Sequence, residues 1–506
     1  MIFKPHFPIF HQFRTHTFFM RITQDIRQLE PRALWNHFAD LNAVPRPSKK
    51  EDRVIAFMEN FGEQLGLETL VDQAGNVIIK KPASKGMEDR PVVILQSHLD
   101  MVHQKNSDTI FDFDSEGIRS YSDGEWVHAE GTTLGADNGI GVAAIMTLLS
   151  STDIPHPPIE ALFTIDEETG MTGAKGLDKN LLSGSILLNL DSEEDDELTI
   201  GCAGGIDTNT RLAYREESPD SESSAWTLVV SGLKGGHSGI DIHLGRGNAN
   251  KLLTRLLYKL TNQIGLRIGS LDGGSLRNAI PREATAVVVV SNAHVEDLHH
   301  EIATRKEAIL NEFSVIEPDL EITLKPTGAL PKSVMHPDDQ DHILSALYAV
   351  PNGVFRMSPD IPGLVETSSS LARIIIQDGI FITQSLQRSS VESGKMDIAN
   401  AVRSAFESIG ATVENDGDYP GWAPNANSAV LELMEGLYEQ LFSSKPKVAA
   451  CHAGLECGII SEHYPGLDMI SFGPTIRHPH SPDEKVNIES VRKFWGFLTA
   501  ALQEIS

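Results

Sequence analysis

Cysteine is scarce in this sequence, with three residues among 506, at positions 202, 451 and 457. Three cysteines cannot build the disulfide framework of a small secreted domain, and free thiols are typical of proteins in a reducing cytoplasm. We therefore expect a cytoplasmic protein.

Long apolar runs and an excess of positive charge are also missing. No run of about 18 uncharged apolar residues occurs, which excludes a membrane-spanning helix. The 70 acidic residues outnumber the 42 Lys and Arg residues and give a net charge of −28. A field of that sign repels phosphate backbones and anionic lipids, so we expect neither nucleic-acid nor membrane partners.

The remaining composition is that of a globular protein with an ample core. Of the 506 residues, 40% are hydrophobic and 22% are charged, and the length allows about two to four domains. The first 22 residues stand apart because they are rich in Phe and His, and Pro8, His11 and Arg14 interrupt any signal-peptide core. We expect an unstructured extension over residues 1–22, followed from residue 25 by an amphipathic helix.

From about residue 50 to 204 the sequence alternates between helical and strand patterns, with the strand at 91–100 apolar on both faces. Such strands are typical of a mostly parallel sheet covered by helices, which predicts an α/β domain. We expect helices at 54–65 and 140–149 and strands at 76–80, 91–100, 161–166 and 186–191.

The pattern changes after residue 204. Residues 214–225 are acidic and rich in Ser, which predicts a surface loop, and strands are then expected at 227–233 and 284–291 with a helix at 250–264. Asp378-Gly379 joins two strand patterns, as a type I′ hairpin turn does. A helix expected at 430–442 and an apolar strand at 469–472 return to the α/β pattern of the first domain. We predict an α+β domain over 205–405, inserted into a catalytic domain formed by 23–204 and 406–506.

Three of the buried strands are followed by metal-competent side chains. His98 and Asp100 end the first, the pair Glu167 and Glu168 follows the second, and Asp191 follows the third. Ligands of open α/β sheets bind beyond the carboxyl ends of the strands, so we expect these side chains to meet there.

Two loops add further candidates. Asp137 lies in the glycine-rich stretch GTTLGADNGIG, where it would either cap the following helix or join the site. His480 follows a strand pattern in SFGPTIRHPHSPDE, with His478 as a competing ligand. Imidazole and carboxylate together suit Zn, Mn or Co. The set exceeds one tetrahedral ion and fits two ions that share a carboxylate and a water.

Other motifs carry no chemistry in our interpretation. GLKGGHSG lacks the Gly-Lys-Ser/Thr of a phosphate-binding loop, and neither GxSxG nor HExxH occurs. We expect the acidic run at 193–197 to be a solvated loop and Cys202 and Cys457 to be buried, unreactive residues.

Several segments together resemble a known family. These are HLDMV, TTLGADNGIG, IDEETG, NLDSEE, GCAGGID, LKGGHSG, LRNAIPRE, HAGLEC and GPTIRHPHSPDE. They are similar to the co-catalytic zinc peptidases that include the bacterial Xaa-His dipeptidases, carnosinase and peptidase V. The resemblance runs from about residue 29 to the C-terminus, and it implies that the inserted domain acts as a lid.

The resemblance implies a complete metal-binding set. His98 and Asp191 would bind one ion, Glu168 and His480 the other, and Asp137 would bridge the two. It implies two Zn²⁺ ions per chain, for which Co²⁺ or Mn²⁺ substitutes.

Further roles are implied for residues around that set. Asp100 would accept a hydrogen bond from His98 and fix its tautomer. Glu167 would be the general base and acid, and His237 of the lid would polarise the scissile carbonyl.

Substrate contacts are implied by shorter matches. Asn278, Arg388 and the backbone at Gly454 would hold the substrate and its C-terminal carboxylate. The implied activity is hydrolysis of unsubstituted dipeptides, Xaa-His included, by a cytoplasmic enzyme with a homodimer as its expected assembly. Rival interpretations are an amidohydrolase that removes acyl groups from amino acids and a metal-binding protein without catalysis. Glu167 argues against the second because it is not an expected ligand.

Deleting residues 1–19 should leave dipeptidase activity and the melting temperature unchanged, because this segment has no strand or helix periodicity and lies outside the family match. Thermal melts and kinetics of the two forms side by side test this. A clear fall in melting temperature on deletion would show that the segment packs on the domain.

Overall fold

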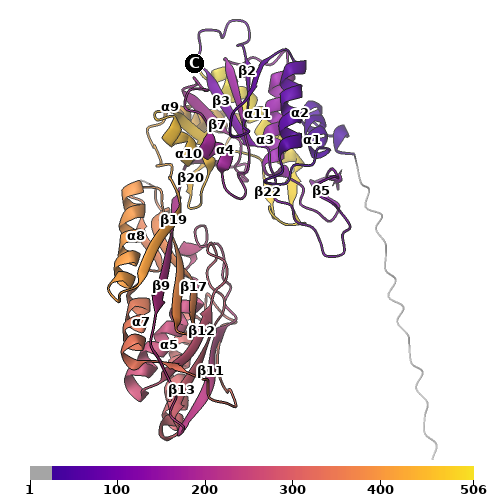
Figure 1. The fold of residues 1–506 in the computed structure, drawn as a ribbon. Coiled ribbons are helices and arrows are strands. Elements are labelled where there is room, and N and C mark those ends of the chain that lie inside the picture. Colours follow the sequence, from indigo (N-terminus) through magenta and orange to yellow (C-terminus); the bar gives the residue numbers. More distant parts are fainter. Residues whose placement is uncertain (1–24, 360) are drawn as a thin grey trace, which may run out of the picture.

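The structure is a computed structural model that describes residues 25–359 and 361–506. The predicted extension at 1–22 lies outside the described residues. Two lobes are apparent in Figure 1, one built on an eight-stranded sheet and the other on a nine-stranded sheet. The predicted α/β fold with an inserted α+β lid is confirmed.

The eight-stranded sheet has a parallel centre. β6, β3, β7 and β21 run parallel to one another, and β1 and β2 extend one edge in antiparallel fashion. In spatial order the strands are β1 (Glu68–Val71), β2 (Val77–Lys81), β6 (Ile159–Thr164), β3 (Val93–His98), β7 (Ile186–Asn189), β21 (Asp468–Ser471), β8 (Glu197–Cys202) and β20 (Lys447–Cys451).

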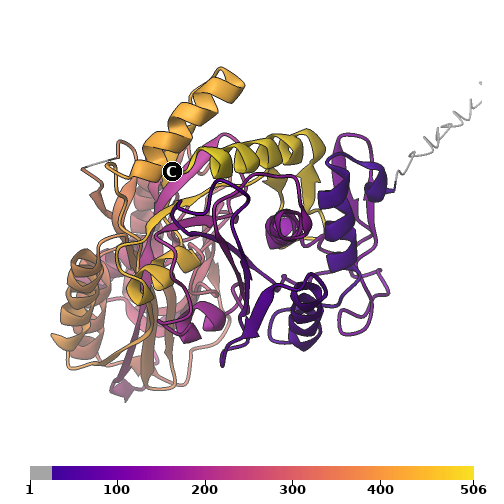
Figure 2. The same cartoon turned by 90° about the horizontal axis from the view of Figure 1, so that it is seen from above.

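Helices cover both faces of this sheet, as its doubly apolar strands require. Val93 and Leu95 of β3 pack into one core with the larger helices, whereas Ile94 packs into a second core on the opposite face. The first face carries α1 (Arg32–Asn42), α2 (Asp52–Gln64), α3 (Ala136–Ser150), α9 (Ala429–Phe442) and α11 (Ile488–Glu504); the second carries α4 (Thr172–Gly176) and α10 (Glu456–His463). Seen from above, the indigo α1 and the yellow α11 belong to one layer although they come from opposite ends of the chain (Figure 2).

The first helix begins later than expected. A short 3₁₀ turn, η1 (Ile26–Gln28), is followed by an extended stretch, and α1 begins at Arg32. Pro31 explains the delay, because proline is tolerated at a helix start and not within one.

The second lobe is an antiparallel sheet covered by helices. Its strands are, in spatial order, β14 (Glu321–Pro326), β11 (Ser223–Ser231), β13 (Ala284–Ser291), β12 (Arg267–Gly273), β17 (Val365–Gln377), β18 (Ile380–Ser389), β9 (Gly204–Ala213) and β19 (Thr412–Tyr419), with β16 (Gly353–Met357) also paired to β17. The covering helices are α5 (Ala249–Ile264), α6 (Val295–Phe313), α7 (Pro337–Ala349) and α8 (Glu392–Glu407). Asp378 and Gly379 both have positive φ, as the predicted I′ turn demands.

This second lobe, called the lid below, extends beyond the boundary expected at 405. β19 pairs with β9, so the lid sheet continues to Tyr419. Part of the predicted loop at 214–225 is also ordered by pairing, because β10 (Glu216–Glu217) pairs with β15 (Val334–Met335).

The chain enters and leaves the lid at one place. Cys202 and Trp422 exchange two backbone hydrogen bonds of 2.9 Å, one in each direction. These two segments form the neck between the lobes, and Gly204 and Gly421 pack so closely there that a Cβ on Gly204 would lie 2.5 Å from the Gly421 nitrogen.

A small sheet supports the loop of His480. Its strands are β22 (Ile476–Arg477), β23 (Lys485–Asn487), β5 (Trp126–Ala129) and β4 (Ser120–Ser122). Among the described residues, the helices are too short or too polar to cross a membrane.

Candidate metal centre

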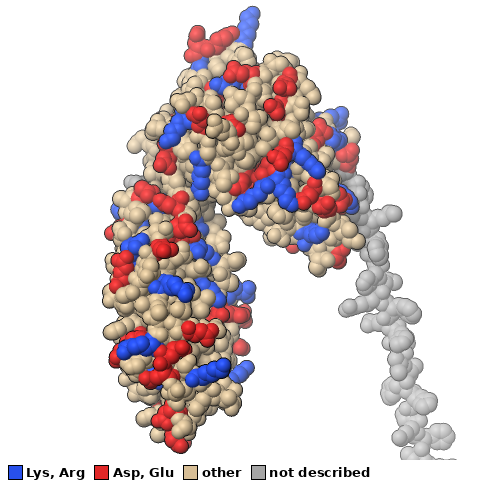
Figure 3. All heavy atoms as spheres, viewed as in Figure 1, with Lys and Arg blue, Asp and Glu red and all other residues tan. Residues whose placement is uncertain are grey.

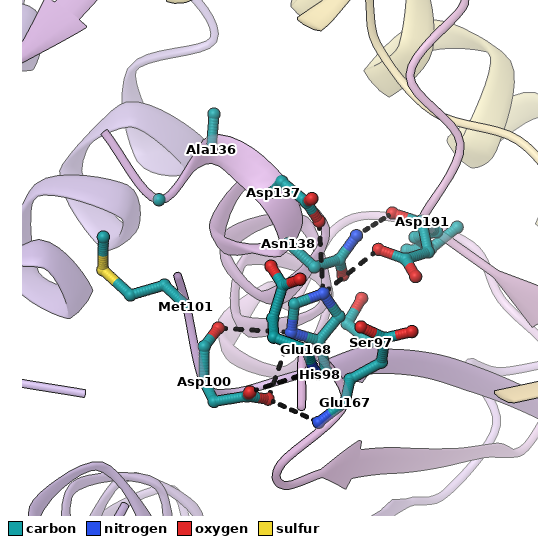
Figure 4. A network of polar contacts seen from close by, with 12 residues as sticks. Ser97, His98, Asp100, Met101, Ala136, Asp137, Asn138, Glu167, Glu168 and Asp191 are labelled. Atoms are coloured by element: carbon teal, nitrogen blue, oxygen red, sulfur yellow. Dashed lines mark hydrogen bonds and ion pairs between the residues drawn. The ribbon is translucent and has the colours of Figure 1, made fainter. Parts of the chain in front are cut away.

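His98 is the last residue of β3 and is fully buried at the carboxyl end of the parallel strands. Its Nδ1 lies 3.2 Å from the Asp100 carbonyl oxygen and 3.3 Å from Asp100 Oδ1, so Asp100 holds the ring from that side. Its Nε2 faces two carboxylates, those of Asp137 and Asp191 (Figure 4).

Two His–carboxylate pairs share one further carboxylate. His98 Nε2 lies 3.4 Å from Asp191 Oδ1, and His480 Nε2 lies 3.0 Å from Glu168 Oε2. Asp137 stands between them, with Oδ1 at 3.2 Å from His98 Nε2 and Oδ2 at 3.2 Å from His480 Nε2. All five predicted ligands therefore converge, whereas the competing His478 is not part of these groups.

Asp137 does not cap its helix. The cap position of α3 is Gly135, and no side chain at that end makes the local capping bond. Glu484 accepts the backbone N–H bonds of residues 134–137 instead. The Asp137 carboxylate is thus free to face the two histidines, which favours the site over the capping interpretation.

Asp100 also positions the glutamate pair. Its Oδ1 accepts a hydrogen bond from the Glu167 backbone N–H at 3.0 Å, and Oδ2 accepts one from that of Glu168 at 3.3 Å. The residue before them, Asp166, has positive φ and receives the hydroxyl of Thr172 at 2.8 Å. This turn points both glutamates at His98, with which they form a close group (Figure 4).

Electrostatics at the centre favour an added positive charge. Hydrogen bonds to Asp137 and Glu168 raise the pKa of His480 to about 11. Burial opposes charging of His98, yet Asp191, Asp100 and Asp137 raise its pKa well above its ordinary value. Burial also raises the pKa of Glu167, and the neighbouring Asp191 and Glu168 raise it further.

The spacing of these atoms fits metal coordination. Two ligand atoms about 2.0–2.2 Å from one tetrahedral ion lie roughly 3.3–3.6 Å apart. The four N–O distances of 3.0–3.4 Å approach that value. Glu168 Oε1 is buried without a hydrogen-bond partner, and the buried Asp191 Oδ1 has only the long 3.4 Å contact with His98 Nε2, as expected of ligand oxygens. The residues present therefore fit a pair of divalent ions.

The predicted lid residues form a second group. His237 Nε2 lies 3.5 Å from Arg388 Nη2, and the Ser238 backbone N–H donates to the Asn278 carbonyl at 2.8 Å. Arg388 Nη1 donates to Tyr419 Oη at 2.8 Å, and a Cβ on Gly454 would lie 2.9 Å from the Tyr419 ring. His237, Arg388 and Gly454 thus lie close together around Arg388 and Tyr419. The side chain of Asn278, by contrast, is exposed.

The two groups are separate in this structure. No hydrogen bond or ion pair joins His237 to the metal-centre residues within the described part of the chain. Figure 3 shows the surface deeply hollowed between the two lobes. The five predicted metal ligands thus gather in the catalytic lobe, whereas His237 and Arg388 lie in the lid, with Gly454 of the catalytic lobe next to Tyr419 of the lid.

Sequence reasoning missed two acidic groups near the centre. Glu193, expected in a solvated loop, is half-buried, and burial together with the nearby Asp137 and Asp191 raises its pKa to about 8. Glu456 lies under the sheet end, where its Oε2 accepts hydrogen bonds from Gln96 and Thr164. Their only sequence signal was membership of the matched segments NLDSEE and HAGLEC.

Comparison with known proteins agrees with this geometry. Residues 94–504 match the model of Peptidase family M20/M25/M40. The chain is 44% identical over 481 residues to the cytosol non-specific dipeptidase of Escherichia coli (strain K12), covering 95% of this chain and 99% of that protein.

Solved structures give the same result. The crystal structure of aminoacylhistidine dipeptidase from Vibrio alginolyticus superposes with a TM-score of 0.89 at 44% identity, covering 96% of this chain and 98% of that one. A tripeptidase from Staphylococcus aureus shares the fold at a TM-score of 0.55 and 16% identity, covering 94% and 99%. The protein thus belongs to the M20/M25/M40 family of peptidases.

Proposed function

We propose that this peptidase hydrolyses unsubstituted dipeptides of broad sequence, Xaa-His included, with two divalent metal ions. The observation that carries the proposal is the Asp137 carboxylate, which presents one oxygen to His98 and the other to His480. A carboxylate placed in this way could be shared by two ions held side by side.

The two His–carboxylate pairs indicate which residues would hold the ions. His98 and Asp191 would bind one ion and Glu168 and His480 the other, with Asp137 common to both. The ions, which we propose to be Zn²⁺ with Co²⁺ or Mn²⁺ as substitutes, would polarise the scissile carbonyl and lower the pKa of a water molecule.

Glu167 is the proposed general base and acid. It shares the turn of Glu168 but takes part in neither His–carboxylate pair. Its burial beside other carboxylates raises its pKa, which suits a group that must bind and release a proton near neutral pH. Glu167 would take a proton from the attacking water and return it to the leaving amine.

The lid would supply the remaining contacts. His237 Nδ1 accepts hydrogen bonds from the backbone N–H groups of Gly239 and Ile240, at 3.2 and 3.0 Å. These bonds favour the neutral imidazole with its proton on Nε2, a donor suited to the developing oxyanion. Arg388 would bind the substrate carboxylate, with Asn278 and the Gly454 backbone beside it. Approach of the lobes is needed to bring both groups to one substrate.

Similarity to the dipeptidases of Escherichia coli and Vibrio alginolyticus supports the choice of dipeptides. We also propose a cytoplasmic location, which the name of the first relative and the free thiols support. The homodimer expected from the sequence remains a prediction that light scattering of the purified protein would test.

A substrate comparison tests the function. Purified protein loaded with Zn²⁺ or Mn²⁺ is assayed with a dipeptide, the same dipeptide extended to a tripeptide, and an N-acetyl amino acid. We expect hydrolysis of the dipeptide alone. Preference for the N-acetyl substrate would instead identify an amidohydrolase, and no turnover would favour a metal-binding protein without catalysis.

Glu167→Ala should keep both ions and the fold but lower kcat by about 10²–10⁴-fold, the usual contribution of a general base. Metal analysis alongside kinetics checks this, with Glu168→Ala as the matched control from the same turn, which should lose metal. Metal loss from the Glu167 variant equal to that of the control would make Glu167 a ligand.

His237 should remain neutral down to a pH near 4, because burial and the nearby Arg388 lower its pKa to about 4 from 6.5. Between pH 6.5 and 4 the unfolded chain binds a proton that folded His237 does not. Its contribution therefore makes the free energy of unfolding fall as the pH falls through this window. NMR titration of the ring protons, assigned with His237→Gln, gives the midpoint. A midpoint near 6.5 would contradict the burial argument.

A further inference from the structure

The turn that delivers Asp137 is held by a carboxylate from a distant part of the sequence. Glu484 Oε2 accepts the backbone N–H groups of Leu134 at 2.7 Å and Gly135 at 3.0 Å, and Oε1 accepts those of Ala136 at 2.7 Å and Asp137 at 3.3 Å. Four N–H donors match the four acceptor positions of the two carboxylate oxygens.

A buried guanidinium holds the same turn from the other side. Arg46 Nη2 donates to the Gly135 carbonyl at 2.6 Å, so the Gly135 residue is bound at its N–H by Glu484 and at its C=O by Arg46. Arg46 Nη1 also donates to the carbonyl oxygens of Leu99 and Asp100 at 3.0 and 3.1 Å. The end of β3 and the Asp137 turn are therefore fixed to one side chain.

Close packing leaves this turn little room to move. Gly135 has φ of 68°, and a Cβ there would lie 2.5 Å from Arg46 Nη2. Both Arg46 and Glu484 are nearly inaccessible to solvent, at 2% and 3% exposure. Burying a charge is costly. The φ/ψ angles of Asp137 and Asn138 are non-helical, so the four N–H groups that Glu484 accepts belong to the turn before the regular part of α3. The position of Glu484 thus calls for a reason beyond capping.

That reason lies in its sequence position. Glu484 follows His480 by four residues on the same loop, and the Glu484 backbone N–H donates to Ser481 O at 3.0 Å. The loop that carries the proposed ligand His480 therefore also binds, through Glu484, the turn that carries the shared ligand Asp137.

We propose that Glu484, together with Arg46, is a positioning residue that fixes the Asp137 carboxylate between His98 and His480 and so sets the affinity of the chain for its two ions. This inference rests on the proposed two-ion site. Partners that orient metal ligands without touching the ion typically contribute 10–100-fold in metal affinity or activity. Glu484 would do so through the backbone of the ligand rather than through its side chain.

The test compares two buried glutamates. Glu484→Gln keeps the size but places an amide nitrogen, which cannot accept, against two of the four N–H donors. Glu160→Gln is the matched control: Glu160 is equally buried and accepts the backbone N–H groups of Ser183 and Gly184 at 2.8 and 3.1 Å. Glu160 lies near the start of β6, at the opposite end of the sheet from the metal centre.

Zn²⁺ affinity is measured on each folded, metal-free protein by competition with a chromophoric chelator. We expect Glu484→Gln to bind Zn²⁺ about 10–100-fold more weakly than the parent, and Glu160→Gln to bind it within about twofold of the parent while melting at a lower temperature. Unchanged affinity in Glu484→Gln, or an equal loss in both variants, would overturn the proposal.

A second measurement keeps the inference separate from the proposed function. Amide hydrogen exchange at residues 134–137 of the metal-free protein should become at least tenfold faster in Glu484→Gln and stay unchanged in Glu160→Gln. Unchanged exchange in Glu484→Gln would show that Glu484 does not hold residues 134–137 in place and would overturn the proposal. A parent chain that binds fewer than two ions would contradict the proposed function, whereas the exchange result would still decide whether Glu484 holds the turn. If Glu484→Gln fails to fold, Arg46→Lys, which keeps the charge but loses the forked contact, should show the same changes in both measurements.

Discussion

The crowding of carboxylates at one end of a parallel sheet is the constraint on which this structure depends. Asp100, Asp137, Asp191, Glu167 and Glu168 gather within a few ångströms of His98, and the side chains of all but Glu167 are largely out of water. Such an arrangement is unstable unless positive charge joins it, and the raised pKa values of His98 and His480 express that demand. Divalent ions would meet it more completely than protons, so the features that make the site costly for the fold also make it selective for cations.

Much of this centre could be predicted because the ends of the buried strands can be located in the sequence. Apolar runs locate the buried strands, and the polar residues that follow them, such as His98 and Asp191, must then gather at one edge. Asp137 and His480 were harder, since Asp137 could equally have capped a helix and His478 competed with His480 as a ligand, and the motif match was needed to choose them. The hairpin at Asp378-Gly379 could be predicted from two residues alone, because both turn positions require a positive φ and Asp-Gly tolerates it.

Buried charges away from the strand ends could not be predicted in the same way. Arg46 and Glu484 stand in polar stretches that look like surface loops, and only the tertiary structure shows what covers them. The start of α1 and the extent of the lid depend likewise on context. Pro31 delays the helix, and β19 joins the lid through pairing with β9, more than 200 residues away in sequence. Such distant pairing leaves no periodic signal in either segment.

The neck between the lobes has a consequence for the order of folding. Closing a disordered loop costs entropy that grows with the logarithm of its length, and the catalytic sheet must close across the whole lid to join β8 to β20. The lid has its own hydrophobic core, and its two ends meet where Cys202 and Trp422 exchange backbone hydrogen bonds. A lid that folds first therefore presents its ends already side by side. For the catalytic sheet, the folded lid then costs about as much loop-closure entropy as a short connection. The insertion of the lid between the two halves of the sheet therefore adds little to the free-energy barrier of their assembly.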